Sequence, residues 1–259
     1  MSNFPSENSI ILLYDKEKEK KHIINLKDIK KHYSTAYGTI DIEKIKQTEF
    51  GKTVKTHLGY EYILLPATLN DFIMKKLNRL TQIVYPKDAA YIALRLDIKP
   101  GDTVIEAGIG SGAMSAVFAQ ILGKEGKLIS YEKREEFAKN ALKNLRRLNL
   151  DSIVEVKNKD IAEGFDENEV DAVFIDIKEP WLYLDNAIKP LKCGKMIGIL
   201  VPTVNQISLV LKEIEKLPLI NAEVSELLHR FWKTNPDRLR PLDTMSAHTA
   251  FLIFARKVC

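Results

Sequence analysis

Cysteine and histidine are scarce in this sequence. It has two cysteines, Cys193 and Cys259, and five histidines among 259 residues. Two cysteines provide no disulfide framework, although one bridge within the chain or between subunits stays open. The histidines are scattered and the cysteines are far apart in the sequence. No set of residues therefore has the spacing of metal ligands, and we expect no metal site.

Long apolar runs are missing as well. No run approaches the length that spans a membrane, and residues 1–7 have neither the basic nor the apolar region of a signal peptide. We therefore expect a cytoplasmic protein with no membrane segment. Basic residues slightly outnumber acidic ones, which gives a net charge of +4. This excess is compatible with an RNA partner without demonstrating one, because many enzymes have it.

The chain divides near residue 70, which predicts two domains, residues 1–68 and 69–259. Residues 15–21 are charged and are expected to form a solvated hairpin loop, with RNA contact as the alternative. In the first domain, glycines or charged turns separate short β-like stretches, which predicts a small β-barrel or sandwich. These stretches are residues 9–14, 22–26 and 60–65.

Strands and helices alternate in the second domain. The predicted strands are residues 103–105, 127–132, 153–157, 170–176 and 195–201. Parallel strands joined through helices make right-handed crossovers, so this alternation predicts an α/β fold with a doubly wound sheet. Two further strands, near residues 222–231 and 250–256, follow each other without a helix between them and are expected to form a hairpin at the end of the sheet.

Three closely spaced glycines, Gly108, Gly110 and Gly112, follow the first of these strands and open a helical run. Glycines at this position let a ligand approach backbone N–H groups at the positive end of a helix, which indicates a nucleotide cofactor. Gly108, Gly110 and Ala113 also satisfy the nicotinamide fingerprint, so the motif alone does not name the cofactor. Glu106 favours S-adenosylmethionine, because its carboxylate repels a pyrophosphate and attracts the ammonium of an amino-acid cofactor.

Acidic residues end three successive strands, at Glu132, Asp160 and Asp176. The carboxyl ends of parallel strands share the edge of the sheet where ligands bind. Glu132 follows Gly112 by twenty residues, the interval at which an acidic residue holds ribose hydroxyls in such sheets. For any single carboxylate, a helix cap or a solvated loop end is the alternative.

Several segments together resemble a known family. They are the glycine motif, the QIVYPKD run at residues 82–88, residues 175–176 with 179–181, and the HTAFL run at residues 248–252. In these segments the sequence is similar to the tRNA (adenine-N1)-methyltransferases of the TrmI/Trm61 family. The similarity covers nearly the whole chain, and the YPKD segment is its most particular part. One departure is Lys178, where the family usually has proline.

The resemblance implies a Rossmann-like class I methyltransferase sheet with an antiparallel last strand, preceded by the small β domain. It also implies methyl transfer from S-adenosylmethionine to N1 of T-loop adenosine 58 of tRNA, with neighbouring adenosine 57 in archaeal members. Members of the family are homotetramers. Because the target base is buried in folded tRNA, it has to be extruded before it reacts.

Asp176 is the expected catalytic residue. A carboxylate that accepts a hydrogen bond from the adenine N6 amino group holds the base and stabilises the charge that grows on the ring. Tyr85 is a candidate aromatic wall beside the base, with a packed core tyrosine as the alternative. His248 is a second candidate for this pocket, although a lone histidine beside a strand is more often structural.

The expected cofactor contacts extend along the same edge of the sheet. We expect Glu132 to hold the ribose hydroxyls and Asp160 the adenine amino group, while the resemblance implies that Gln82 closes over the methionine end. The expected cofactor residues are Gln82, Glu106, Gly108, Ile109, Gly110, Ser111, Gly112, Ala113, Met114, Glu132, Lys133, Asp160, Ile161 and Asp176.

Basic residues cluster near the C-terminus, with Phe231 and Trp232 between them. This mixture suits contact with an RNA backbone and stacking on bases. Structural ion pairing with Glu226 or Asp237 is the competing interpretation. The expected tRNA contacts are Tyr85, Arg230, Lys233, Arg238, Arg240 and His248.

Two other functions stay open as alternatives. One is a nicotinamide-dependent oxidoreductase with a Rossmann domain, and the other is a non-catalytic tRNA-binding subunit of such a methyltransferase. The hairpin at the end of the sheet counts against the first. The intact glycine motif and Asp176 argue against the second.

Overall fold

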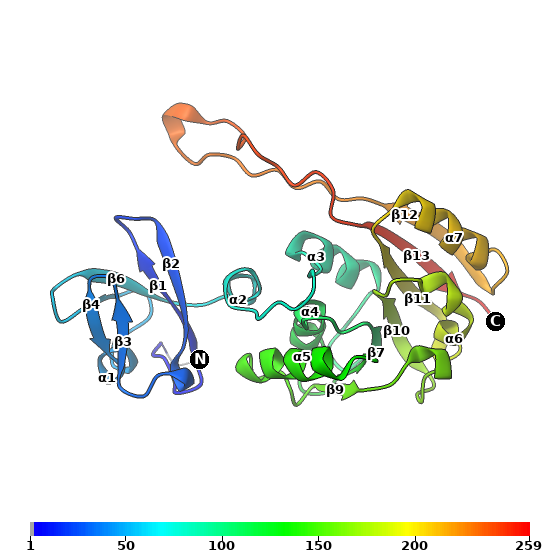
Figure 1. The fold of residues 1–259 in the computed structure, drawn as a ribbon, viewed down its shortest axis with the longest axis horizontal. Coiled ribbons are helices and arrows are strands. Elements are labelled where there is room, and N and C mark those ends of the chain that lie inside the picture. Colours follow the sequence, from blue (N-terminus) through cyan, green and yellow to red (C-terminus); the bar gives the residue numbers. More distant parts are fainter. Residues whose placement is uncertain (1–2) are drawn as a thin grey trace. The chain divides into compact units, whose positions relative to one another are not determined.

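The computed structural model describes residues 3–259 and divides into two compact units (Figure 1). The first unit comprises the chain up to Leu77 together with Arg147–Asn149. The second comprises Asn78–Arg146 and Leu150–Cys259. Helix α2 (Leu69–Lys75), which the sequence analysis assigned to the second domain, therefore belongs to the first unit.

The first unit is built on antiparallel strands, as expected. Four of them form a sheet in the order β2-β1-β6-β5, and β3 pairs separately with β4. Residues 16–19 form the turn between β1 and β2, which confirms the predicted hairpin loop. Alternate side chains such as Ile11, Leu13 and Leu64 are fully buried, so one face of the sheet covers a core of its own. The elements are β1 (Ile10–Asp15), β2 (Lys20–Asn25), β3 (His32–Thr35), β4 (Gly38–Asp41), α1 (Ile42–Lys46), β5 (Thr53–Lys55) and β6 (Glu61–Pro66).

The second unit contains a seven-stranded sheet in the order β12-β13-β11-β10-β7-β8-β9. Strands β7 to β11 pair in parallel, whereas β13 is antiparallel to both β11 and β12. This topology confirms the predicted α/β sheet with an antiparallel last strand. The strands are β7 (Thr103–Ala107), β8 (Lys127–Tyr131), β9 (Val154–Lys157), β10 (Val170–Ile175), β11 (Leu191–Val201), β12 (Leu219–Ser225) and β13 (Phe251–Lys257).

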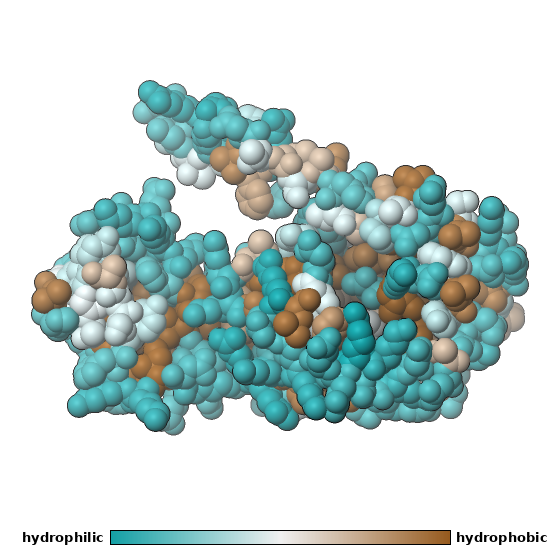
Figure 2. All heavy atoms as spheres, in the orientation of Figure 1, coloured by the Kyte–Doolittle hydropathy of each residue, from teal (hydrophilic) through white to brown (hydrophobic). Residues whose placement is uncertain are grey.

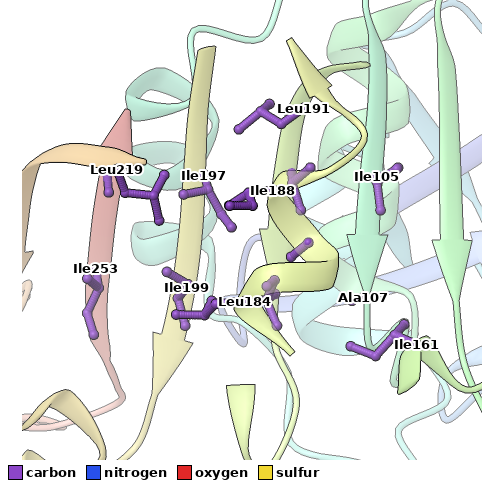
Figure 3. Close-up of a cluster of buried hydrophobic side chains, with 14 of the residues drawn as sticks. Ile105, Ala107, Ile161, Leu184, Ile188, Leu191, Ile197, Ile199, Leu219 and Ile253 are labelled. Carbon is purple, nitrogen blue, oxygen red and sulfur yellow. The ribbon is translucent and has the colours of Figure 1, made fainter. Parts of the chain in front are cut away.

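Helices cover the sheet: α3 precedes its first strand, and the others lie between strands, because parallel strands need crossover connections. They are α3 (Pro86–Arg95), α4 (Ala113–Leu122), α5 (Glu135–Arg147), α6 (Leu184–Ile188) and α7 (Val204–Ile214). Figure 3 shows Leu184 and Ile188 of α6 packed beside Ile197 and Ile199 of β11. Each of these side chains is at most 5% exposed. Burying a side chain of this size contributes about 1.5–3 kcal/mol to stability. This burial stabilises the sheet whose carboxyl edge carries the candidate site.

Residues 226–250 form an extended arm between β12 and β13 (Figure 1). The expected strand near residues 222–231 was wrong at its end, because β12 stops at Ser225. Beyond it the two sides of the arm pair only locally, where Lys233 N–H donates to the Arg240 carbonyl at 2.8 Å. Apolar arm residues such as Phe231 and Trp232 are 61% and 58% exposed, and Figure 2 shows apolar side chains on its surface. These apolar residues have no core against which to pack, so the strand does not continue into the arm.

Two further features bear on the expectations from composition. Cys193, near the start of β11, and Cys259, after β13, form a disulfide within the chain, which settles the question that two cysteines left open. Within residues 3–259, no helix is both long enough and apolar enough to cross a membrane.

Candidate functional site

The glycine loop between β7 and α4 approaches the end of β10 very closely. Gly108 has a φ of +93°, and a Cβ built on it would lie 2.1 Å from the backbone oxygen of Asp176. Gly110 has a φ of +51°, and its Cβ would lie 2.9 Å from Thr81 Oγ1. A side chain is therefore excluded at Gly108 by both conformation and space. The loop presents bare backbone at the carboxyl edge of the sheet, as the motif predicts.

A pocket lies on this loop, within the second unit. The ends of β7 and β10 form one wall and residues 82–84, just before α3, form another. Ile83 and Val84 are lining residues that the sequence analysis missed, since nothing in their apolar side chains distinguishes them from core residues. The lining residues are Gln82, Ile83, Val84, Glu106, Gly108, Ile109, Gly110, Ser111, Ala113, Met114 and Asp176.

Glu106 is a buried carboxylate at the base of this pocket. Its side chain accepts hydrogen bonds from the hydroxyls of Ser115 and Ser130, each 2.6 Å from Oε2. Burial raises the pKa of Glu106 to about 7, helped by the negative charges of Asp176 and Glu132 and opposed by the two serine hydrogen bonds. Because both serines bind the same oxygen, Oε1 is left for a donor on a ligand.

Asp176 follows β10 and lines the pocket beside the glycine loop. Its backbone N–H donates to the Ala107 carbonyl at 2.9 Å, which continues the pairing of β10 with β7 beyond the strand. Within residues 3–259, the structure gives its carboxylate no hydrogen bond or ion pair. Burial alone raises the pKa of Asp176 to about 6. A partly buried carboxylate without a partner can accept a hydrogen bond from a ligand in the pocket.

Glu132 and Asp160 are at the ends of their strands but outside the pocket lining. Glu132 is 5% exposed, and its carboxylate accepts from the backbone N–H of Arg134 at 3.0 Å. Asp160 caps the short 3-10 helix Ile161–Glu163 through a 3.0 Å bond from Ala162 N–H, so the cap alternative holds for this residue. Lys133, Gly112 and Ile161 are also absent from the lining; Lys133 Nζ lies 3.7 Å from Asp160.

Tyr85 is the N-cap residue of α3 and is half-buried, without a place in the pocket lining. Lys87 and Asp88, in the first turn of α3, belong to a polar network that the sequence analysis missed. Lys87 Nζ donates to Asp88 at 2.7 Å, to the Thr249 hydroxyl at 2.7 Å and to the Leu227 carbonyl at 2.8 Å. Thr249 in turn donates to Asp88 at 2.9 Å. The network ties the start of α3 to both ends of the arm.

His248 also lies at the base of the arm, outside the pocket lining. Its Nδ1 is 2.7 Å from Glu226 and its Nε2 is 2.9 Å from the carbonyl of Pro202. Both partners are acceptors, and they raise the pKa of His248, with Glu226 as the larger cause. These contacts hold the histidine between Glu226 and Pro202, and its expected contact with tRNA stays a prediction.

The basic residues of the arm differ in their contacts. Lys233 and Arg240 both pair with Asp243, at 3.3 Å for Lys233. Structural ion pairing was the competing interpretation, but it named Glu226 and Asp237 as the acidic partners and not Asp243. Arg230 and Arg238 are exposed, and no ion pair or side-chain hydrogen bond holds either of them within residues 3–259. Their guanidinium groups are therefore accessible to another molecule.

Two remaining expectations concern the loop after β10 and metal ions. Lys178, which stands where the resembling family usually has proline, accepts a 3.0 Å hydrogen bond from Gln206 through its carbonyl. This bond fastens the loop to α7 without the proline. Across residues 3–259, no three or more histidine, cysteine or acidic side chains gather into a group that could hold a metal ion.

Comparison with known proteins identifies similar sequences. The family model described as "tRNA methyltransferase complex GCD14 subunit" matches residues 59–246. A Methanocaldococcus jannaschii protein named tRNA (adenine(57)-N(1)/adenine(58)-N(1))-methyltransferase TrmI is 30% identical, over 95% of this chain and 94% of its own length. The match to the relative includes both units, and the family match includes the whole glycine loop and the arm residues up to 246.

Solved structures agree with this result. A crystal structure named as a SAM-dependent O-methyltransferase from Thermotoga maritima has a TM-score of 0.90 and 43% identity, covering 99% of this chain and 96% of that one. A structure of the tRNA (m1A58) methyltransferase TrmI from Aquifex aeolicus has a TM-score of 0.83 and 35% identity, covering 99% of this chain and all of that one. All three names describe methyltransferases, which favours a methyltransferase over an oxidoreductase or a non-catalytic subunit.

Proposed function

Because the chain belongs to the family of tRNA (adenine-N1)-methyltransferases and transfers a methyl group from S-adenosylmethionine to adenine 58 of tRNA, we propose that the pocket on the glycine loop is its active site. The observation that supports this proposal most directly is the state of Asp176. Its carboxylate is partly buried, has no partner within the described residues and lines the pocket beside the glycine loop. A purely structural carboxylate is normally paired or hydrogen-bonded.

The residues around the pocket fit the chemistry of S-adenosylmethionine, which supplies a methyl group activated by a sulfonium. Oε1 of Glu106 is available to the α-ammonium, and the backbone of residues 109–114 is open because Gly108 and Gly110 carry no side chain. Gln82, Ile83 and Val84 close the opposite wall. The carboxylates of Glu106 and Asp176 would repel a pyrophosphate.

Further along the edge of the sheet we assign the nucleoside part of the cofactor. Glu132 is proposed to accept hydrogen bonds from the ribose hydroxyls, because one end of β8 places it next to the loop. Asp160, beside Lys133 and Ile161, is proposed to accept from the adenine amino group. Asp160 caps its helix through Oδ1, and among residues 3–259 Oδ2 has only Lys133, 3.7 Å away, as a partner, so this oxygen is available.

Asp176 is the proposed catalytic residue for the tRNA adenine. The N1 lone pair lies in the plane of the ring and is a nucleophile without the help of a strong base. Asp176 accepts a hydrogen bond from the N6 amino group, which orients N1 and offsets the positive charge that forms on the ring. Tyr85, at the start of α3, is proposed to form an aromatic wall beside the extruded base.

The direct test is the product. Unmodified tRNA incubated with the protein and methyl-labelled S-adenosylmethionine is expected to contain labelled N1-methyladenosine, measured by mass spectrometry of its nucleosides. Fragment analysis would place the label at position 58 and would show whether adenine 57 is also modified. A labelled ribose or a labelled small-molecule oxygen, which the name of the Thermotoga maritima structure suggests for that protein, would contradict the proposed specificity.

We propose that the arm contacts the tRNA through its unpaired cations. Changing Arg230 and Arg238 together to alanine is expected to weaken tRNA binding and to reduce its salt dependence by about two counterions, since each lost phosphate contact releases about one fewer. Lys233 and Arg240 are expected to contribute less, because Asp243 already holds them. Filter binding or fluorescence anisotropy over a salt series measures both quantities.

The matched control for the arm removes two exposed lysines outside it, Lys124 and Lys212, which changes net charge equally. Its salt dependence should stay close to that of the wild type. If both double variants lose affinity to the same extent, the arm has no special role. If only the melting temperature of the Arg230 and Arg238 variant falls, these residues are structural.

Two broader assignments complete the proposal. A homotetramer is supported by the family resemblance and by the exposed apolar side chains of the arm, which include Phe231, Trp232 and Leu239. A subunit beside them would remove this surface from water. Location in the cytoplasm is supported by the tRNA substrate.

A further inference from the structure

Residues 77–85 belong to no helix or strand. Within this segment, residues 82–84 form one wall of the pocket. No ladder of backbone hydrogen bonds therefore fixes residues 82–84 in place. Side chains from other elements instead hold Asn78, Leu80 and Thr81, just before these residues, and most of the hydrogen bonds come from two asparagines on α5. Neither asparagine was among the expected site residues.

Asn140 and Asn144 are one helical turn apart on α5 and are 8% and 1% exposed. The side-chain amides of both donate to the Asn78 carbonyl at 2.9 Å. Asn144 accepts from the Asn78 backbone N–H at 3.1 Å, and Asn140 accepts from its side-chain amide at 2.6 Å. Asn78 is thereby held through its backbone N–H, its carbonyl and its side chain.

The same network reaches the glycine loop. Asn144 donates a further hydrogen bond to the Ser111 carbonyl at 3.0 Å. The Ser111 hydroxyl accepts from the backbone N–H groups of Leu80 and Thr81, each at 3.1 Å, and lies 3.0 Å from the Thr81 hydroxyl. Ser111 is 2% exposed, and its hydroxyl holds the wall segment.

We propose that Asn140 and Asn144 are positioning residues for the cofactor: they clamp residues 78–81 to the glycine loop and so hold residues 82–84 ready at the pocket. A wall that is ordered beforehand does not lose conformational freedom when the cofactor binds, so the affinity is higher. The inference rests on the proposed placement of the cofactor in this pocket.

The test is the variant Asn144→Ala, which removes the link between Asn78 and Ser111. The Kd for S-adenosylmethionine, measured by calorimetry, is expected to rise about tenfold, because binding must then order the wall. The turnover number at saturating cofactor should change much less than KM for the cofactor. Hydrogen exchange at the amides of Leu80 and Thr81 should become faster, while exchange in β7 and β8 stays slow.

Asn140→Ala is the milder second variant, since it leaves both bonds of Asn144 to Asn78 and the bond to Ser111. Its Kd for the cofactor is expected to rise by roughly threefold, because less preorganisation is lost. This variant tests the proposal if Asn144→Ala does not fold.

The control is Thr56→Val in the first unit. Thr56 is 3% exposed, and its hydroxyl donates to the Tyr37 carbonyl at 2.8 Å and accepts from Tyr60 N–H at 3.1 Å.

Thr56→Val should lower the melting temperature without changing the cofactor Kd. If the asparagine variants lower the melting temperature but keep the wild-type Kd, the two residues are only structural and the inference is overturned. It is also overturned if Thr56→Val raises the Kd as much as they do. Failure of the wild-type protein to bind the cofactor would instead refute the proposed placement of the cofactor.

Discussion

Replacing Asp176 with alanine is expected to lower the turnover number by roughly a hundred- to a thousandfold, the usual cost of removing one preorganised group that stabilises charge in the transition state. The variant loses the acceptor for the adenine N6 amino group but keeps the glycine loop. The Kd for S-adenosylmethionine should therefore change much less than the turnover number. Single-turnover methylation at saturating cofactor measures the first quantity and calorimetry the second.

Asp176→Asn and Asp171→Asn provide a matched pair on one strand. Asp176 follows the carboxyl end of β10, whereas Asp171 lies near its other end and pairs with Lys192 at 2.7 Å. Asp176→Asn should be nearly as inactive as the alanine variant, while Asp171→Asn should keep wild-type turnover. An active Asp176→Asn with a normal fold would show that its negative charge is not needed.

Stability separates the catalytic role of Asp176 from a structural one. Burial raises its folded pKa to about 6 from 3.8, so the ionised carboxylate destabilises the fold increasingly as the pH rises from about 4 to 6 and fully above that range. Asp176→Asn is therefore expected to be more stable than the wild type at pH 7.5. A carboxylate that capped a helix would give the opposite sign.

The same pKa predicts how turnover depends on pH. Asp176 accepts the hydrogen bond from adenine as a carboxylate, so kcat/KM for tRNA, which reports ionisation of the free enzyme, should rise as the pH passes through about 6 and then level off. Glu106, whose pKa is about 7, is expected to affect cofactor affinity over a slightly higher range. Turnover that falls over this interval would contradict the role of Asp176.

Much of the fold was predictable because its signals are local. Strands β7, β8 and β10 are short apolar runs followed by glycine or acid, and crossover handedness limits how such strands can be arranged. The positions of Gly108 and Gly110 were predictable for the same reason, since a strand that turns directly into a helix needs φ values that other residues avoid. The structure adds why Gly108 is required: the backbone of Asp176 fills the place of its side chain.

The parts that could not be predicted depend on contacts between distant residues. Asn144 meets Ser111 and Asn78 across 33 and 66 positions of the chain, and an isolated asparagine on a helix carries no signal for such partners. The prediction of a strand in the arm failed for a different reason. Phe231 and Trp232 have the composition of a strand, but whether they join a sheet depends on neighbours that the sequence does not specify.

Lys87 is the residue for which we expect the largest loss of stability. It lies 162 positions from its partner Thr249 and forms an ion pair with Asp88, at side-chain exposures of 13% for the lysine and 2% for the aspartate. Replacing Lys87 with methionine keeps the apolar stem and leaves a buried carboxylate without its cation. Breaking a buried pair from one side costs about 3–5 kcal/mol, so we expect the free energy of unfolding to fall by this order. Denaturant titration measures the change.

Two further variants show whether the lost stability comes from the stranded charge. Lys192→Met breaks a pair in which the lysine is 37% exposed, so it should cost much less, about 1 kcal/mol at most. Adding Asp88→Asn to Lys87→Met removes the stranded charge and should restore part of the stability, because Thr249 can still donate to the amide oxygen. If Lys87→Met is no less stable than Lys192→Met, or if Asp88→Asn lowers the stability further, the network does not fasten the arm to α3. The contacts of His248 with Glu226 and the carbonyl of Pro202 would then remain at the base of the arm.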